Sequence, residues 1–211
     1  MKDAPPALGP NPAAPFLVPI LVITAAGLIA GLFAVQRDDA LYPLRAAVGA
    51  AALWQYRRHY RPRGGSPPAA AIVIGCVTFV VWVGLTGSLA DPSFQSPSVR
   101  EGWRVPWLLC RIAGAVIVIP LAEQLAFRGY LARRLMAHDF AAIPLTQLSW
   151  PAVLISSALF GALHPQFLAG TAAGLAYALA ARHRGRLGDA VIAHAVTNAL
   201  LAACALAEWQ P

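Results

Sequence analysis

The sequence predicts an all-α fold, a polytopic membrane helix bundle of about seven spans. Two observations predict it. First, 58% of the 211 residues are apolar and only 12% are charged, about half the charged fraction (~25%) of a typical soluble domain. Second, several apolar runs approach the roughly 20 residues that a helix needs to cross a bilayer. The 16 Lys and Arg residues outnumber the 9 Asp and Glu residues. They cluster between the apolar runs rather than along one face, so a nucleic-acid partner is not expected.

The N-terminal part of the chain, residues 16–103, is expected to form accessory membrane helices. It follows a lead at residues 1–15 that is rich in Pro and Ala and is predicted to be disordered. The run Phe16–Val35 is uninterrupted and long enough to span a bilayer. A shorter apolar helix is expected at Leu41–Gln55, and a third span at Ala69–Leu89, with a basic loop between them.

Residues 104–211 are expected to form a second helix bundle, reached through a polar loop at Asp91–Arg104. A mixed connection at residues 136–149 interrupts this region, and the pair His164-Pro165 divides it further, because proline lacks the backbone donor that a helix needs. In chain order, the expected helices are Trp107–Arg134, Trp150–His164, Gln166–Ala181 and Asp189–Trp209.

The basic residues predict the orientation in the membrane, because cytoplasmic loops carry an excess of Lys and Arg. With seven spans and the N-terminus inside, most basic residues fall in inner segments. We therefore expect an integral protein of a bacterial inner membrane with a cytoplasmic N-terminus. The inner residues are Lys2, Arg57, Arg58, Arg61, Arg63, Arg133, Arg134, Arg182, Arg184 and Arg186, and the outer ones are Arg37, Arg45, Arg100 and Arg104.

Three polar clusters interrupt the apolar helices of the C-terminal half: Glu123–Arg128, Phe160–His164 and His194–Asn198. An ionisable group at the centre of a membrane helix costs on the order of 3 kcal/mol or more, so it marks a function or a specific partner. A structural role stays open as well, since His194 and Asn198 share a helix face and side chains of this type hold membrane helices together. The occurrence of all three clusters in one half of the chain favours a functional polar site.

Helix geometry separates the residues of the first cluster. Gln124 and Arg128 are four apart and can touch along one face, whereas Glu123 is rotated by about 100° from Gln124. A glutamate that is not aimed at its nearest arginine suits a general base, and His164 is a candidate to orient it. Arg128 has a simpler alternative, in which its side chain extends to the inner membrane surface.

The three clusters, in this order, resemble the motifs of the CPBP family of intramembrane glutamic proteases. This family includes the type II CAAX prenyl endopeptidases and the bacteriocin-processing enzymes. Glu-x-x-x-x-Arg begins at Glu123, Phe-x-x-x-His at Phe160 and His-x-x-x-Asn at His194. The resemblance covers roughly residues 104–206 and implies a catalytic core in the C-terminal half. The segment Val81–Leu85, together with the arginine-rich loop after the second helix, looks like a bacterial branch associated with C-terminal protein sorting.

The resemblance implies a role for each matching residue. Glu123 is implied to be the base that activates a water molecule, and His164 to help hold that water. His194 and Asn198 are implied to stabilise the oxyanion of the tetrahedral intermediate. The supporting residues are Gln124, Arg128 and Phe160.

Gln124 departs from the family pattern, which opens with two adjacent glutamates. A glutamate at this position could form a charge-assisted hydrogen bond with Arg128, whereas glutamine keeps the shape but not the charge. We therefore expect Gln124→Glu to raise both stability and proteolytic rate.

The expected activity is metal-independent endoproteolysis, without a cofactor, on the tails of membrane-anchored or lipid-modified proteins. The expected partners are that protein or peptide substrate and the lipid bilayer. Three rival functions stay open. Gln124 motivates a catalytically impaired scaffold or partner-binding protein. Glu123, His164 and His194 could instead bind Zn²⁺, although the sequence has no His-Glu-x-x-His. The same buried groups could also serve a transporter or proton relay.

The depths of Glu123 and His164 in the membrane limit how these two side chains can meet. At 1.5 Å per residue, Glu123 lies about 12 Å inside Leu131, and His164 lies about 21 Å beyond Trp150. These two side chains meet only if the helix at Trp150 begins below the membrane surface or tilts. Pro165 then turns the chain within the bilayer, where irregular backbone is tolerated beside a water-filled cavity. We infer a cavity that opens toward the cytoplasm.

Overall fold

The structure is a computed structural model that describes residues 11–33, 40–60, 69–88 and 100–207. Within these ranges the chain consists of helices and turns and has no strand, so the predicted all-α membrane bundle is confirmed. Most of the predicted N-terminal lead, most of the basic loop after the second helix and most of the polar loop at Asp91–Arg104 lie outside the described residues.

The helices follow the predicted order. The N-terminal part contains α1 (Ala14–Phe33), α2 (Tyr42–Gln55), the 3₁₀ turn η1 (Arg57–His59) and α3 (Ala69–Thr86). One continuous helical stretch then runs over Glu101–Arg134. It is composed of η3 (Glu101–Trp103), α4 (Arg104–Ala113), η4 (Gly114–Val118), α5 (Ile119–Gln124), η5 (Leu125–Leu131) and α6 (Ala132–Arg134). Two short 3₁₀ turns, η6 (Phe140–Ala142) and η7 (Leu145–Gln147), lead to α7 (Trp150–Gly161), α8 (Phe167–Arg184) and α9 (Leu187–Ala207).

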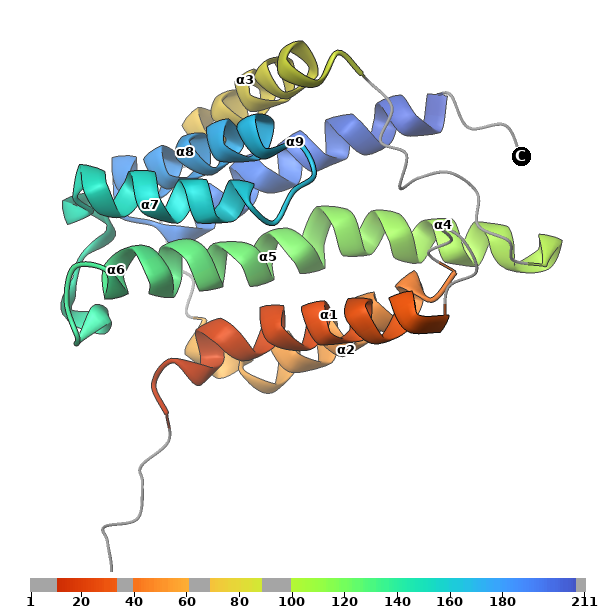
Figure 1. Ribbon diagram of the computed structural model, residues 1–211, viewed down its shortest axis with the longest axis horizontal. Helices are drawn as coiled ribbons and strands as arrows, with labels where there is room; N and C mark the ends of the chain where they lie inside the picture. Colours follow the sequence, from red (N-terminus) through yellow and green to blue (C-terminus); the bar gives the residue numbers. More distant parts are fainter. Residues whose placement is uncertain (1–10, 34–39, 61–68, 89–99, 208–211) are drawn as a thin grey trace, which may run out of the picture.

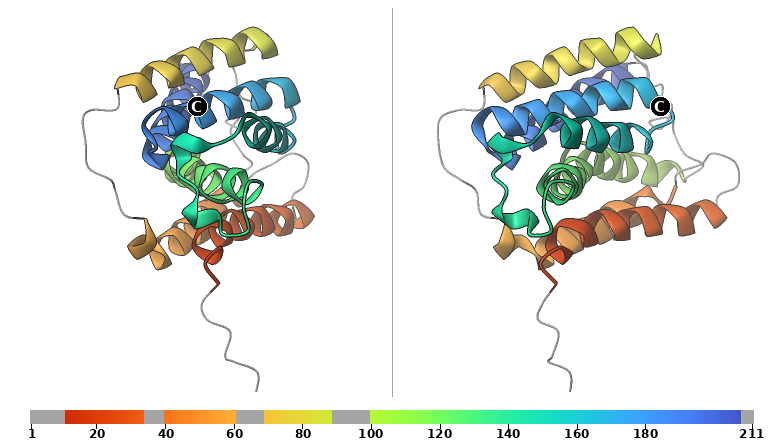
Figure 2. Two further views of the ribbon diagram at one scale, coloured as in Figure 1. Left: turned by 90° about the vertical axis from the view of Figure 1, so that its left-hand side faces the viewer. Right: turned by 60° about the vertical axis from the view of Figure 1, so that its left-hand side comes forward.

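The central stretch Glu101–Arg134 separates the other helices into two groups. Figure 1 shows α1 and α2 along one side of it and α7, α8 and α9 along the other, with α3 outermost. Both views of Figure 2 agree that α3 and the α1–α2 pair lie at opposite faces of the bundle. Helix α3 packs against α8 and α9, and α7 packs against α8. The polar clusters therefore face an interior enclosed by α3, α8 and α9 on one side and the central stretch on the other.

Four helices of the described chain are long and apolar enough to cross a membrane, and they are Ala14–Leu32, Ala69–Thr86, Glu101–Arg134 and Leu187–Ala207. Helix α7 is apolar but shorter. Successive helices alternate in direction along the chain when α2, α7 and α8 are included with these four (Figure 1). This alternation is the arrangement that the sequence predicts for a chain that crosses the membrane repeatedly.

Basic residues gather at one end of the bundle. The Tyr60 hydroxyl, just after η1, donates a hydrogen bond to the carbonyl of Pro15 at 2.6 Å, which ties the end of α2 to the start of α1. The guanidinium carbon of Arg133 lies 5.6 Å from the ring centroid of Phe16, and that of Arg182 lies 5.0 Å from the ring of Trp150. The arginines at the C-terminal ends of α2, α6 and α8 therefore share the end at which α1 and α7 begin.

Helix α7 ends three residues earlier than the sequence analysis expects. It begins after Ser149, whose side chain accepts a hydrogen bond from the amide of Ala152, and ends at Gly161. A Cβ atom at Gly161 would collide with the hydroxyl of Thr171 on α8, so only glycine allows the two helices to approach here. His164 consequently lies in the tight turn between α7 and α8 rather than on the helix.

Two π-helical segments, η4 and η5, interrupt the central stretch, and the sequence analysis did not predict them. In η4 the amide of Ile119 bonds to the carbonyl of Gly114, an i to i+5 bond. The next residue, Pro120, has no N–H with which to continue this ladder. The carbonyl of Ala115, five residues before Pro120, therefore lacks its backbone donor. Bulges of this type often occur at functional sites.

Candidate active site

A cavity of about 140 Å³ lies between the central stretch and helices α3, α8 and α9. It accommodates several water molecules. All four residues that the sequence analysis assigns to catalysis line it, although they come from three separate segments. The lining residues are Trp82, Arg111, Ala115, Ile119, Glu123, Phe160, His164, Ala173, Tyr177, His194, Thr197, Asn198 and Leu201.

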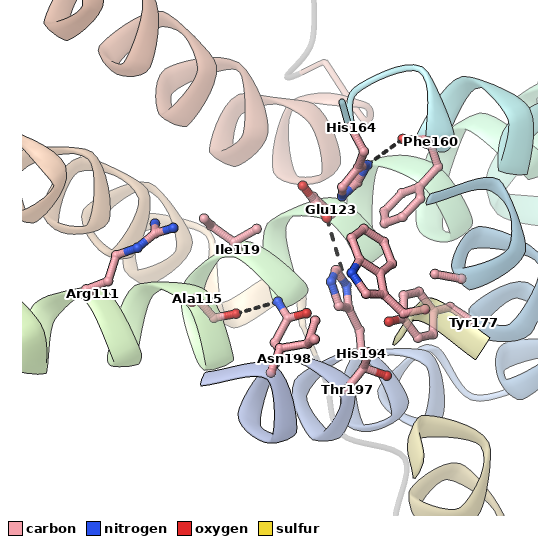
Figure 3. A pocket seen from close by; sticks show the side chains of 13 residues that line it. Arg111, Ala115, Ile119, Glu123, Phe160, His164, Tyr177, His194, Thr197 and Asn198 are labelled. Atoms are coloured by element: carbon pink, nitrogen blue, oxygen red, sulfur yellow. Dashed lines mark hydrogen bonds and ion pairs between the residues drawn. The ribbon is translucent and has the colours of Figure 1, made fainter. Parts of the chain in front are cut away.

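Glu123 lies on α5 and is 8% exposed. Figure 3 shows its carboxylate between the imidazoles of His164 and His194. Its Oε2 atom is 3.9 Å from Nδ1 of His194, which is too long for a hydrogen bond. Within the described residues, Oε2 has no hydrogen-bond partner. A buried carboxylate oxygen without a donor is costly, so this oxygen is suited to bind a water molecule in the cavity.

His164 has its ring orientation fixed by the turn after α7. Its Nδ1 lies 2.9 Å from the carbonyl oxygen of Phe160. A carbonyl only accepts, so this nitrogen carries the proton. In the neutral ring, Nε2 then bears the lone pair and accepts hydrogen bonds. Figure 3 shows the ring edge opposite Phe160 turned toward Glu123.

His194 has the opposite arrangement. Its Nδ1 lies 3.0 Å from the amide nitrogen of Gln124, which donates in the assigned orientation. Nδ1 is then the acceptor, and Nε2 of the neutral ring carries the proton. The ring of Tyr177 stacks on the imidazole with 4.5 Å between centroids and 17° between planes. The two histidines therefore present one proton acceptor and one proton donor to the site.

The side chain of Asn198 satisfies a backbone carbonyl of η4. Its Nδ2 donates a hydrogen bond of 2.8 Å to the carbonyl of Ala115, the same carbonyl that Pro120 leaves without a donor. The amide group has two N–H donors, so one of them is used here and a second is left for the cavity. The π-helical segment thus fixes a side chain of α9 against the central stretch.

Gln124 and Arg128 bond to different partners instead of pairing with each other. Arg128 is fully buried and donates to the carbonyl of Gly174 on α8. Its guanidinium carbon also lies 5.0 Å from the ring centroid of Phe160. The Nε and Nη1 atoms of Arg128 and the Oε1 atom of Gln124 have no hydrogen-bond partner within the described residues. Arg128 therefore remains inside the bundle, and the alternative in which it extends to the membrane surface is wrong.

Phe160 joins these groups by packing. Its ring lies 4.8 Å from the ring of His164 and 5.8 Å from that of His194, centroid to centroid. It also contacts Phe127 and Tyr177 edge-on. Aromatic contacts of this kind orient rings at little entropic cost. Phe160 therefore packs against both imidazoles.

Four further polar or aromatic residues of the cavity were not among the predicted site residues: Trp82, Arg111, Tyr177 and Thr197. Of these four, Arg111 could have been identified from the sequence, because it is a charged residue inside an apolar run. Thr197 lies inside the third polar cluster but is a common residue in helices, and Tyr177 lies on α8, which carries none of the three clusters. Trp82 belongs to α3 in the accessory part of the chain, and its ring lies 5.8 Å from that of His164. Only tertiary packing brings it to the site.

Within the described residues, no three His, Cys, Asp or Glu side chains cluster closely enough to hold a metal ion. Glu123, His164 and His194 line one cavity, but they do not converge on a common point as zinc ligands do at about 2.0–2.2 Å. The cavity offers the carboxylate of Glu123, a hydrogen-bond acceptor at Nε2 of His164, and one N–H donor each from His194 and Asn198. This combination can deprotonate a water molecule and stabilise a developing negative charge.

The region that contains this cavity also resembles a known protein family. Residues 105–200 match the sequence model of a family described as type II CAAX prenyl endopeptidase Rce1-like. The matched region begins in α4 and ends in α9, and it includes Glu123, His164, His194 and Asn198. No curated protein and no solved structure matches the chain. The chain, an all-α membrane helix bundle, is therefore similar through residues 105–200 to the CPBP family of CAAX-type intramembrane proteases.

Proposed function

We propose that this protein is a metal-independent glutamic endopeptidase that cleaves the tails of membrane-anchored or lipid-modified proteins. The observation that supports this proposal best is the pair of histidines with opposite hydrogen-bonding roles. The Phe160 carbonyl makes Nε2 of His164 an acceptor, and Gln124 makes Nε2 of His194 a donor. Peptide-bond hydrolysis needs both functions on opposite sides of the reacting carbonyl.

In the proposed reaction, Glu123 takes a proton from a water molecule whose position is fixed by a hydrogen bond to Nε2 of His164. The water oxygen attacks the carbonyl carbon and forms a tetrahedral intermediate. Its oxyanion accepts hydrogen bonds from Nε2–H of His194 and from the second Nδ2–H of Asn198. When the C–N bond breaks, Glu123 returns its proton to the leaving amine. Each proton and electron pair is thereby accounted for without a metal ion.

The test is cleavage of a membrane-anchored fluorogenic peptide by the full-length protein in lipid vesicles. Glu123→Gln should abolish cleavage, because a general base contributes about 10²- to 10⁴-fold to the rate. Glu101→Gln is the matched control, since this residue is exposed and lies outside the cavity. Activity should survive EDTA and phenanthroline. Loss on chelation with recovery on adding Zn²⁺ would show a zinc protease instead.

Gln124 supports one alternative, a catalytically impaired scaffold or partner-binding protein. Its Oε1 atom is buried without a partner in the described structure, where the family pattern has a carboxylate. The variant Gln124→Glu separates the two functions. An impaired protein should gain cleavage only in this variant. The proposed enzyme should cleave before the substitution and more rapidly after it, because a carboxylate at this position would stabilise a positively charged, more strongly donating His194.

We further propose that the protein lies in a bacterial inner membrane with its N-terminus in the cytoplasm. The basic end of the bundle supports this orientation, because the arginines at the C-terminal ends of α2, α6 and α8 lie there. At 1.5 Å per residue, Glu123 lies about 16 Å along the helix from Arg134 at that end. The scissile bond would therefore be cut inside the bilayer, on a segment that enters from the cytoplasmic side.

A further inference from the structure

The aromatic ring of Tyr177 lies flat against the imidazole of His194. The two ring centroids are 4.5 Å apart, and the two planes are inclined by only 17°. Figure 3 shows Tyr177 beside His194 and Thr197 in the wall of the cavity. Tyr177 comes from α8 and is 2% exposed, whereas His194 comes from α9. The stacked pair therefore joins two helices at one of the groups proposed to stabilise the oxyanion.

The hydroxyl of Tyr177 is bound about one helical turn further along α9. It shares a hydrogen bond with the side chain of Thr197, which lies on the same face of α9 as His194. The Thr197 hydroxyl has one proton, and its oxygen lies 2.9 Å from the carbonyl of Gly75 and 3.1 Å from that of Ala193. Because carbonyls only accept, Thr197 uses its proton there, and Tyr177 is the donor to the threonine oxygen.

This hydrogen bond excludes Tyr177 as a further donor to the substrate. A phenol has a single proton to donate, and Thr197 takes it. The ring is nevertheless well fixed, because Thr197 holds its hydroxyl end and the ring of Phe160 packs against it edge-on, with 6.1 Å between centroids. Tyr177 therefore presents a rigid aromatic surface to the imidazole rather than a reactive group.

The imidazole of His194 needs such a surface. The hydrogen bond at Nδ1 from Gln124 restrains one atom of the ring but not its plane, since the terminal torsion of a histidine is broad. A ring stacked on its face restricts the tilt that remains, so Nε2–H points in one direction. This direction matters because oxyanion donors act only when they are aligned before the charge develops. A misplacement of about 1 Å costs on the order of 10²-fold in rate.

From this geometry we infer that Tyr177 is a positioning residue for peptide-bond hydrolysis, which holds the plane of the His194 imidazole so that its Nε2–H is aligned with the oxyanion. The inference rests on the proposed protease function. It also connects helix α3 to the reaction, because the carbonyl of Gly75 orients Thr197 and Thr197 anchors Tyr177. Helix α3 lies outside the matched residues 105–200.

Two substitutions separate the ring of Tyr177 from its hydroxyl in the vesicle assay. Tyr177→Phe keeps the stacked ring and should retain about one third or more of the wild-type kcat. Tyr177→Leu removes the stack and should lower kcat by about 10- to 10²-fold with little change in KM, because His194 acts on the transition state. An equally large loss in Tyr177→Phe would make the hydroxyl the active group and overturn the inference. A wild-type kcat in Tyr177→Leu would also overturn it.

Phe140→Leu is the matched control for the loss of a buried aromatic ring. Phe140 is 5% exposed, packs edge-on against Phe16 and Tyr130 and lies outside the cavity. This variant should lower the melting temperature in detergent much as Tyr177→Leu does, yet keep the wild-type kcat. Equal losses of kcat in the two variants would show an effect of stability alone and overturn the inference. If Tyr177→Leu does not fold, Tyr177→Met, whose flexible side chain fills irregular space, has the same expected result.

Nitrogen NMR of the protein with isotope-labelled histidine in vesicles measures the state of the His194 ring without any cleavage. At about pH 8, where an imidazole is neutral, His194 should show an unprotonated Nδ1 and a protonated Nε2, and His194→Ala identifies the signal by its loss. Tyr177→Phe should preserve this signal, and Tyr177→Leu should broaden or split it as the ring tilts away from Gln124. An unchanged signal in Tyr177→Leu overturns the inference. If the wild type cleaves no peptide but the signal depends on Tyr177 in this way, the protease proposal fails and the positioning of His194 by Tyr177 stands.

Discussion

Asn198 uses one amide group for two purposes. One N–H of its Nδ2 satisfies the carbonyl of Ala115, which Pro120 leaves without a backbone donor. The other N–H is the donor proposed for the oxyanion. A side chain that is fixed by the backbone in this way requires no reorganisation when the negative charge develops. Preorganised donors of this kind are among the largest contributions to enzymatic rate enhancement.

We predict that Asn198→Ala lowers kcat by about 10²- to 10³-fold, the usual loss for one oxyanion donor, while KM changes little. His194→Ala should act in the same direction. Steady-state kinetics on the vesicle-bound substrate measure both constants, and thermal unfolding in detergent verifies that each variant is folded. A large rise in KM at unchanged kcat would reassign these side chains to substrate docking.

At the scale of elements, the contact between α3 and α9 determines the shape of the cavity. The hydroxyl of Thr197 on α9 donates to the carbonyl of Gly75 on α3 at 2.9 Å. A Cβ atom at Gly75 would lie 2.5 Å from the carbonyl oxygen of Ala193. Small residues permit such close approach between membrane helices. Because Trp82 follows Gly75 by about two turns on the same helix, this contact also positions the indole beside His164.

Gly75→Ala should force α3 away from α9 and destabilise the protein by about 1–3 kcal/mol, as overpacking of a tight contact does. It should also lower cleavage, since Trp82 and Thr197 both line the cavity. Gly84→Ala is the matched control on the same helix, because nothing lies within 4 Å of its added methyl group. Equal melting temperatures and rates for the two variants would show that this contact is not structurally important.

The sequence predicted much of this architecture, and the omissions have physical causes. Apolar run length sets the positions of the long helices, so α1, α3 and α9 lie close to the predicted ranges. The early end of α7 depends on Gly161 packing against Thr171, a contact between two segments. The π-helical bond to Gly114 depends on Pro120 and on Asn198, which lies on a distant helix. Such features arise from tertiary structure and leave no periodic signal.

The same distinction applies to the site. The polar clusters stood out because charged and amide side chains are rare inside apolar helices. The partners of those side chains did not follow from spacing along one helix. Gln124 and Arg128 share a helical spacing of four, yet Gln124 bonds to His194 on α9 and Arg128 to Gly174 on α8. The assigned roles of the four catalytic residues stay predictions that the vesicle assay addresses.

At the scale of the whole molecule, the alternating helices place the start of α1 and the end of α9 at opposite ends of the bundle (Figure 1). The starts of α1, α7 and α9 and the ends of α2, α6 and α8 share the basic end. Arg133 there also lies 5.3 Å from the ring centroid of Phe140. Positive charge concentrated at one end orients the entire bundle relative to the membrane.

We predict that a fluorescent protein fused to the N-terminus folds in the cytoplasm, and that alkaline phosphatase fused to the C-terminus is active outside it. A phosphatase fusion placed after Arg186 should be inactive, because the chain then ends on the inner side. Reporter activity in intact cells measures all three. Equal phosphatase activity at the two positions would contradict the predicted crossing of α9.

Helix α9 has a consequence for how the protein is made. It is the last helix of the described chain to leave the ribosome, and it carries both His194 and Asn198. Synthesis proceeds from the N-terminus, so Glu123 and His164 enter the membrane before the groups proposed to stabilise the oxyanion. A nascent chain that stalls before α9 therefore contains the proposed base but lacks the residues proposed to stabilise the oxyanion. The proposed peptidase should therefore be inactive until α9 inserts, and a copy that stops before α9 should not cleave neighbouring membrane proteins.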